Sequence, residues 1–174
     1  VVGARSAHSV WSSGDGLIWL FGGLGFPASG SSDLLNDFWY YGVDVPEIKI
    51  SGNNTEINDG DSYADRSDHS FFGGAIVNST TQSRTFTIEN VGSKALNLSG
   101  SPIVSLSGAN SGDFSVSSQP SSSSISPSNS LTFTIEFSPS AFGERIAEVS
   151  IASNDIDEGT YNFSIAGIGV ISSY

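Results

Sequence analysis

The feature that most constrains this fold is a regular alternation of apolar and polar residues through the second half of the chain. Its clearest case is the run Leu-Thr-Phe-Thr-Ile-Glu-Phe at 131–137, in which every second residue is apolar. Because successive side chains of a strand point to opposite faces, this period predicts strands with one face in a core and one in water. The same period recurs at 86–88, 96–98, 147–151 and 161–165. With turn-forming residues between these runs, the sequence predicts an all-β fold, an antiparallel β-sandwich.

The first 42 residues follow a different pattern, with two apolar runs separated by a loop rich in Gly and Ser. The first run, 17–21, ends at Gly22-Gly23, and the second, 34–41, reads Leu-Leu-Asn-Asp-Phe-Trp-Tyr-Tyr. Together with Arg5 and His8 in a preceding strand, these runs resemble a single kelch repeat. The resemblance implies one blade of a propeller, and a propeller closes only with about four to eight blades.

One blade cannot bury both of its faces or pair both of its edges within itself. We therefore expect its apolar strands to contact another molecule or further blades. The predicted interface residues are Leu17, Ile18, Trp19, Leu20, Phe21, Leu34, Leu35, Phe38, Trp39 and Tyr41.

The alternating part of the chain also carries several motifs in a fixed order. They include Thr-Phe-Thr-Ile-Glu-Asn-Val-Gly at 85–92, Gly-Asp-Phe-Ser-Val at 112–116, Phe-Thr-Ile-Glu-Phe-Ser-Pro at 133–139 and Ala-Gly-Ile-Gly at 166–169. Over about residues 46–170 the chain resembles the immunoglobulin-like domain called ASPM-SPD-2-Hydin, in its bacterial extracellular form known as the choice-of-anchor D domain. The resemblance implies a non-catalytic sandwich of about seven to nine strands. It also implies a place in a large secreted or surface-attached protein.

These patterns divide the chain into parts. We predict a kelch-like β-hairpin or blade at 1–42, a linker at 43–47, an immunoglobulin-like β-sandwich at 48–170 and a tail at 171–174.

Composition narrows the classes of partner. Eighteen acidic residues against six basic ones give a net charge of −12, which disfavours nucleic acids and anionic membranes because both bind through Lys and Arg. No apolar stretch approaches the ~20 residues that span a bilayer. The chain has no cysteine, so disulfides and thiolate metal sites are excluded. We expect an extracellular or cell-surface location.

Two acidic clusters are candidates for calcium, which prefers six to eight oxygen ligands. The first contains Asp59 and Asp61 in a loop rich in Asn, Asp and Gly, and the second contains Asp155, Asp157 and Glu158 before the last strand. The alternative is that both are solvated turns whose Asp side chains cap their own backbone. No other cofactor is expected.

Catalysis is not expected. His69 lies next to Asp68, but adjacent residues do not place an imidazole against that carboxylate, and no nucleophile-elbow motif is present. We expect a non-enzymatic structural or adhesive protein that joins copies of itself by β-strand addition through its N-terminal segment. The alternative is a spacer or binding module of a larger secreted kelch-propeller protein, whose partner would be a cell-surface glycan or protein.

Overall fold

The computed structural model describes the backbone of residues 5–6, 9–12, 17–25, 33–34, 38–42 and 44–172. The chain divides into two compact units, residues 1–44 and 45–174, which are described separately below. The described residues contain no helix that is long and apolar enough to cross a membrane.

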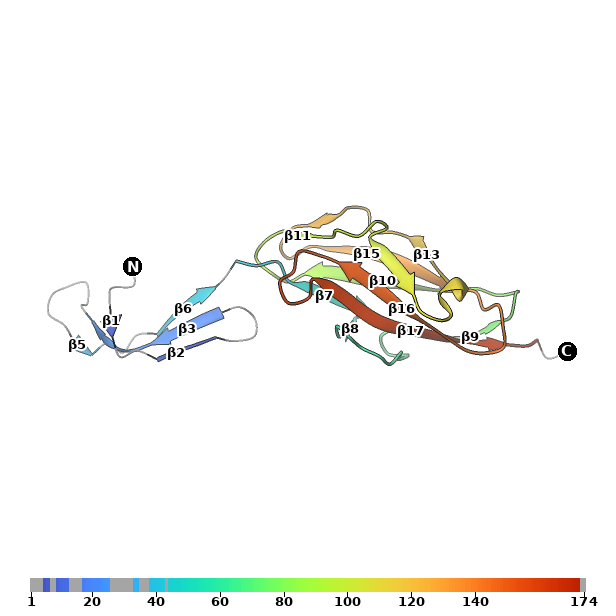
Figure 1. The fold of residues 1–174 in the computed structure, drawn as a ribbon, viewed down its shortest axis with the longest axis horizontal. Helices are drawn as coiled ribbons and strands as arrows, with labels where there is room; N and C mark the ends of the chain where they lie inside the picture. The colour runs from blue at the N-terminus through green and yellow to red at the C-terminus, as the bar shows by residue number, and fades with distance from the viewer. Residues whose placement is uncertain are drawn as a thin grey trace. The chain divides into compact units, whose positions relative to one another are not determined.

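The N-terminal unit contains two small antiparallel sheets in its described residues (Figure 1). One sheet has the order β2–β3–β6, formed by β2 (Ser9–Ser12), β3 (Leu17–Phe21) and β6 (Phe38–Gly42). The other has the order β1–β4–β5, formed by β1 (Arg5–Ser6), β4 (Leu24–Gly25) and β5 (Asp33–Leu34). The two apolar runs of the sequence thus supply β3 and β6, which pair directly with each other.

The C-terminal unit is built on two larger sheets. The first has five strands in the order β13–β15–β10–β7–β8, and all its neighbours are antiparallel. These strands are β7 (Ile48–Gly52), β8 (Thr55–Ile57), β10 (Gln82–Asn90), β13 (Phe114–Ser118) and β15 (Ser130–Phe137).

The second sheet has four strands in the order β12–β16–β17–β9. They are β9 (Phe71–Ile76), β12 (Val104–Ser107), β16 (Gly143–Ala152) and β17 (Thr160–Val170). The strands β16 and β17 form a long antiparallel hairpin (Figure 1), and β9 pairs with β17 in parallel. A short pair, β11 (Leu96–Asn97) with β14 (Ser124–Ile125), and a 3₁₀ turn, η1 (Ser111–Asp113), complete the unit.

Aromatic side chains from both large sheets pack together in the core. Phe86 and Phe133 stack within the first sheet at 5.3 Å between ring centroids, and Phe86 also meets Phe163 of the second sheet at 5.8 Å. All three rings are almost fully buried. Each such ring stabilises the fold by about 1.5–3 kcal/mol when it is removed from water. The two sheets therefore share one apolar core, as the two sheets of a β-sandwich do.

The predicted fold class, an all-β sandwich, is confirmed. In β15 the side chains of Phe133, Ile135 and Phe137 are buried, as the alternation predicts, and Leu131 is half-buried. The stretch at 53–68, rich in Asn, Asp, Gly and Ser, is predicted from sequence to be one loop, which was wrong at 55–57, because these residues form β8 as an edge strand next to β7. The strand β9 was not predicted, because its sequence Phe-Phe-Gly-Gly-Ala-Ile does not alternate.

Candidate functional site

The turn that joins β16 to β17, residues 153–159, carries the second acidic cluster of the sequence. Hydrogen bonds within the turn hold its shape. The Ser153 N–H donates to the Gly159 carbonyl at 3.0 Å, and the Asp155 N–H donates to Ser153 Oγ at 3.0 Å. The Asn154 N–H donates to the carbonyl of Asn97 in β11 at 3.0 Å. The turn is thus fixed both internally and against the rest of the sandwich.

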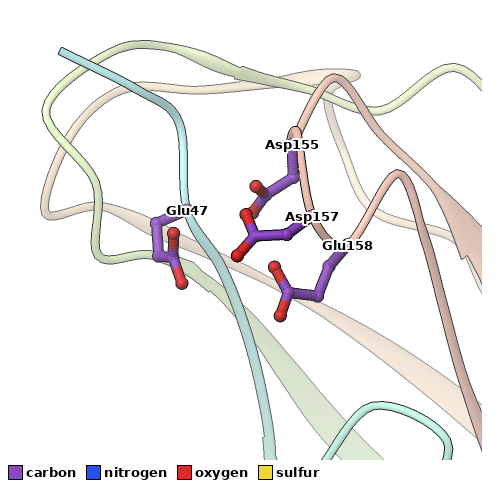
Figure 2. A group of neighbouring side chains, drawn as sticks. All are labelled: Glu47, Asp155, Asp157 and Glu158. Carbon is purple, nitrogen blue, oxygen red and sulfur yellow. The ribbon is translucent and has the colours of Figure 1, made fainter. Parts of the chain in front are cut away.

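Three carboxylates of this turn meet a fourth from a distant part of the chain. Glu47 immediately precedes β7, and Figure 2 shows the side chains of Asp155, Asp157 and Glu158 on the turn facing the segment that carries it. One oxygen from each of the four lies within 4.8 Å of the others. We call these four residues the acidic cluster.

Asp155 is the most deeply placed member of the acidic cluster, with 5% of its surface exposed. Its Oδ2 accepts a hydrogen bond from the Ile48 N–H at 2.6 Å, which fixes the carboxyl group against the start of β7. Its Oδ1 is buried and has no hydrogen-bond partner, and the same holds for Oε2 of Glu158. Buried carboxylate oxygens without a donor are costly, because the group loses its hydration and gains nothing in return.

The charge of the acidic cluster acts on Glu158. Burial, followed by the neighbouring carboxylates of Asp157, Asp155 and Glu47 in that order, raises the pKa of the Glu158 carboxyl to about 7. Glu158 therefore holds a proton more readily than an ordinary glutamate, which relieves part of the repulsion between the four groups.

The segment before β7 is positioned by a fully buried asparagine at the end of β10. Asn90 Oδ1 accepts hydrogen bonds from the Gly92 N–H at 3.0 Å and the Glu47 N–H at 3.4 Å, and the Val91 N–H donates to the Glu47 carbonyl at 2.9 Å. A side chain at Gly92 would place its Cβ 2.4 Å from the Val45 carbonyl oxygen. Only glycine allows this close approach, so the Asn-Val-Gly motif fixes the backbone that presents Glu47.

Of the predicted calcium ligands, the structure brings Asp155, Asp157 and Glu158 together, whereas Asp59 and Asp61 lie outside the acidic cluster. Asp59 Oδ1 accepts a hydrogen bond from the Asn162 N–H at 2.7 Å, and Asp61 Oδ1 accepts one from the Tyr63 N–H at 3.0 Å. These contacts are those of carboxylates that cap backbone groups.

Sequence analysis missed Glu47, which it assigned to the linker. No local signal could have identified it, because the hydrogen bond that brings this segment to the turn joins the Ile48 N–H to the side chain of Asp155, 107 residues later.

The adjacent residues Asp68 and His69 do not form the pair that a hydrolytic triad requires. The buried Asp68 carboxyl accepts hydrogen bonds from the Ser70 N–H at 2.9 Å and from Ser70 Oγ at 2.6 Å. His69 has a positive φ of 67°, as expected in a tight turn. His8 lies outside the described residues. The Asp68 carboxyl is thus a hydrogen-bond acceptor for Ser70 of the same loop.

The predicted interface residues fall on the N-terminal unit, where the described side chains are partly exposed. Ile18 is 39% exposed and Phe21 is 44% exposed, while Trp19 and Leu20 are half-buried. Leu35 lies outside the described residues. The structure describes only the backbone at Leu17, Leu34, Phe38, Trp39 and Tyr41.

A family model described as HYDIN/CFA65/VesB-like, Ig-like domain matches residues 70–167, which is more than half of the chain. The match lies within the predicted sandwich and leaves the kelch resemblance of residues 1–42 as a prediction. No curated protein matches the chain.

Among solved structures, the chain is similar to a protein of unknown function from Porphyromonas gingivalis W83, with a TM-score of 0.52 and 14% identity over 87% of this chain and 62% of that one. The ASH/PapD-like domain 7 of human CEP192 has a TM-score of 0.45 and 16% identity over 84% of this chain and all of that one. The Vibrio cholerae VesB protease has a TM-score of 0.41 and 16% identity over 56% of this chain.

The chain spans 62% of the length of the P. gingivalis protein and 28% of VesB. The likeness to the P. gingivalis protein supports the fold alone.

Proposed function

This chain belongs to the HYDIN/CFA65/VesB-like Ig-like domain family, and on that basis we propose that it is a non-enzymatic structural or adhesive module. Its place of action is outside the cytoplasm, at the cell surface or beyond it. In this proposal the sandwich is a rigid body, and the N-terminal unit joins it to further copies of the chain.

The observation that carries the proposal is that the small sheet β2–β3–β6 has exposed apolar side chains on both faces. Residues opposite each other in a sheet share a face, so the pairs Val10–Leu20 and Trp11–Trp19 lie on opposite sides. Val10 is 52% exposed on one face, and Trp11 is 46% exposed on the other.

The next positions extend both apolar faces. Ile18 lies two residues from Leu20, the partner of Val10, so Ile18 shares the face of Val10. Phe21 lies two residues from Trp19, the partner of Trp11, so Phe21 shares the face of Trp11. A sheet in water normally keeps one polar face, so two apolar faces favour contact with other protein on each side. The kelch-like blade that the sequence predicts would likewise require protein contacts on both of its faces.

Copies of the chain can supply both contacts. One copy adds its strand to an edge of the next sheet through main-chain hydrogen bonds, or packs its apolar face on the next. Because a head-to-tail contact of this kind closes only if its rotation permits, it builds rings or filaments.

Sedimentation velocity over a dilution series tests this proposal with three proteins. We expect the wild-type chain to associate as its concentration rises, and we expect W11S/F21S to remain a monomer. The control variant F142S/I171S removes two exposed apolar residues from the C-terminal unit, where Phe142 is 71% and Ile171 is 73% exposed. It should associate like the wild type.

A wild-type chain that stays monomeric at all concentrations contradicts self-assembly. It would favour the alternative, a spacer or binding module of a longer secreted protein in which further kelch blades cover the N-terminal unit. Its partner would be a cell-surface glycan or protein.

A further inference from the structure

We propose that the acidic cluster is a binding site for one calcium ion, which ties the segment before β7 to the β16–β17 turn. The ligands are carboxylate oxygens of Glu47, Asp155, Asp157 and Glu158 (Figure 2). The proposal does not depend on self-assembly, because all four residues belong to the sandwich unit.

The spacing of the four oxygens fits calcium. Calcium binds oxygen at about 2.3–2.6 Å, so two ligands on opposite sides of one ion are at most about 5 Å apart. The four oxygens lie within 4.8 Å of one another, which is inside this limit. Magnesium is usually bound by one or two carboxylates and keeps several waters, so four converging carboxylates favour calcium.

A second, independent observation points to a ligand. Asp155 is 95% buried, since only 5% of its surface is exposed, and its Oδ1 has no hydrogen-bond partner although Oδ2 is bonded to the Ile48 N–H. Glu158 Oε2 is buried and unpartnered in the same way. A solvated acidic turn would leave such oxygens in water, whereas a cation site buries them and aims them at the ion.

The surroundings of the acidic cluster hold the ligands in place before an ion arrives. Asp155 is fixed by its bond to Ile48, and Glu47 is presented by backbone bonded to Asn90 and Val91. Four carboxylates meet one divalent ion, and the remaining calcium positions are open to backbone carbonyls and water. Ligands fixed in this way lose little conformational freedom on binding.

The site has a mechanical consequence. Glu47 lies three residues after Asp44, where the N-terminal unit ends, and the other ligands lie directly before the last strand of the sandwich. An ion held by both segments links the point at which the chain enters the sandwich to its final hairpin. We expect calcium to raise the unfolding temperature of the sandwich.

The test is calcium titration by isothermal calorimetry at pH 8, where Glu158 is ionised, with scanning calorimetry in EDTA and in excess calcium. We expect one site per chain, magnesium binding at least tenfold weaker, and a rise in Tm of roughly 5–10 °C at one hundred times Kd. The variant D157N/E158Q should lose both the heat of binding and the rise in Tm.

The matched control E144Q/E148Q removes two exposed carboxylates from β16, outside the acidic cluster, and should bind calcium like the wild type. If D157N/E158Q is not folded in EDTA, D157N alone replaces it, because Asp157 is exposed. Absence of calcium heat in the wild type would overturn the proposal. So would an equal Tm rise in the cluster variant and the control, or magnesium binding as tight as calcium.

Discussion

The Asn90 side chain joins three backbone segments, those at Glu47, Lys94 and Ile125, and its removal should lower the free energy of unfolding. It is fully buried at the end of β10. Its Nδ2 donates to the Lys94 carbonyl at 2.7 Å and the Ile125 carbonyl at 2.9 Å. Its Oδ1 accepts from the Gly92 N–H at 3.0 Å and, more weakly, from the Glu47 N–H at 3.4 Å. The substitution Asn90→Ala leaves these backbone groups without their partner.

The expected loss of unfolding free energy follows from the number of hydrogen bonds that the substitution removes. Three bonds of 3.0 Å or less at about 1–1.5 kcal/mol each give about 3–4.5 kcal/mol, and the small cavity left behind adds to this loss. We therefore expect Asn90→Ala to reduce the free energy of unfolding by about 3–5 kcal/mol. With a urea m-value of about 2 kcal/mol/M, the midpoint should fall by about 2 M.

The assay is urea unfolding followed by far-UV circular dichroism. Tryptophan fluorescence is unsuitable for the sandwich, because all three tryptophans lie within residues 1–42. The control is Asn129→Ala, which removes an exposed asparagine with one local bond to Pro127 at 3.3 Å and should change stability by less than about 0.5 kcal/mol. A loss below about 1 kcal/mol for Asn90→Ala would refute the reasoning about unsatisfied groups.

Two further variants test packing and pH dependence. A Cβ at Gly167 would lie 2.4 Å from the buried Phe137 ring, so Gly167→Ala should lower the free energy of unfolding by about 1–3 kcal/mol in the same urea assay. The control Gly112→Ala adds its Cβ in open space and should be nearly neutral. Equal effects would contradict the packing argument. Burial raises the pKa of Asp113, but its hydrogen bonds, including one from Arg145, outweigh burial and leave the pKa below its ordinary value. Its stabilisation is therefore present above the unfolded pKa of about 3.9 and is lost as pH falls through the folded pKa. Between about pH 5 and pH 3, Asp113→Asn should flatten the fall in the urea midpoint, and an unchanged slope would contradict this.

The alternating strands could be predicted from sequence because burial on one face alone determines them. Phe86 and Ile88 of β10, like Phe133, Ile135 and Phe137 of β15, are buried while their neighbours remain more exposed. The strand β9 could not be predicted in this way. It has two glycines, one of them Gly73 with φ of 82°, and it pairs with the distant strand β17, where Phe71 lies opposite Ala166.

The acidic cluster could likewise be predicted from the sequence only in part. The spacing of Asp155, Asp157 and Glu158 in one turn is visible in the sequence, but the addition of Glu47 depends on β7 beginning beside that turn. The sequence also gave no reason to prefer this turn over Asp59 and Asp61, whose oxygens accept bonds from backbone N–H groups. Burial and unpartnered oxygens separate the two sets, and both are properties of the folded chain.

Negative-stain electron microscopy of the purified wild-type chain at micromolar concentration, without a partner, tests whether this protein is an assembly subunit. The two apolar faces of the β2–β3–β6 sheet predict ordered filaments or rings built from copies of the chain. Uniform small particles of monomer size would contradict that prediction and leave the chain as a module of a longer protein.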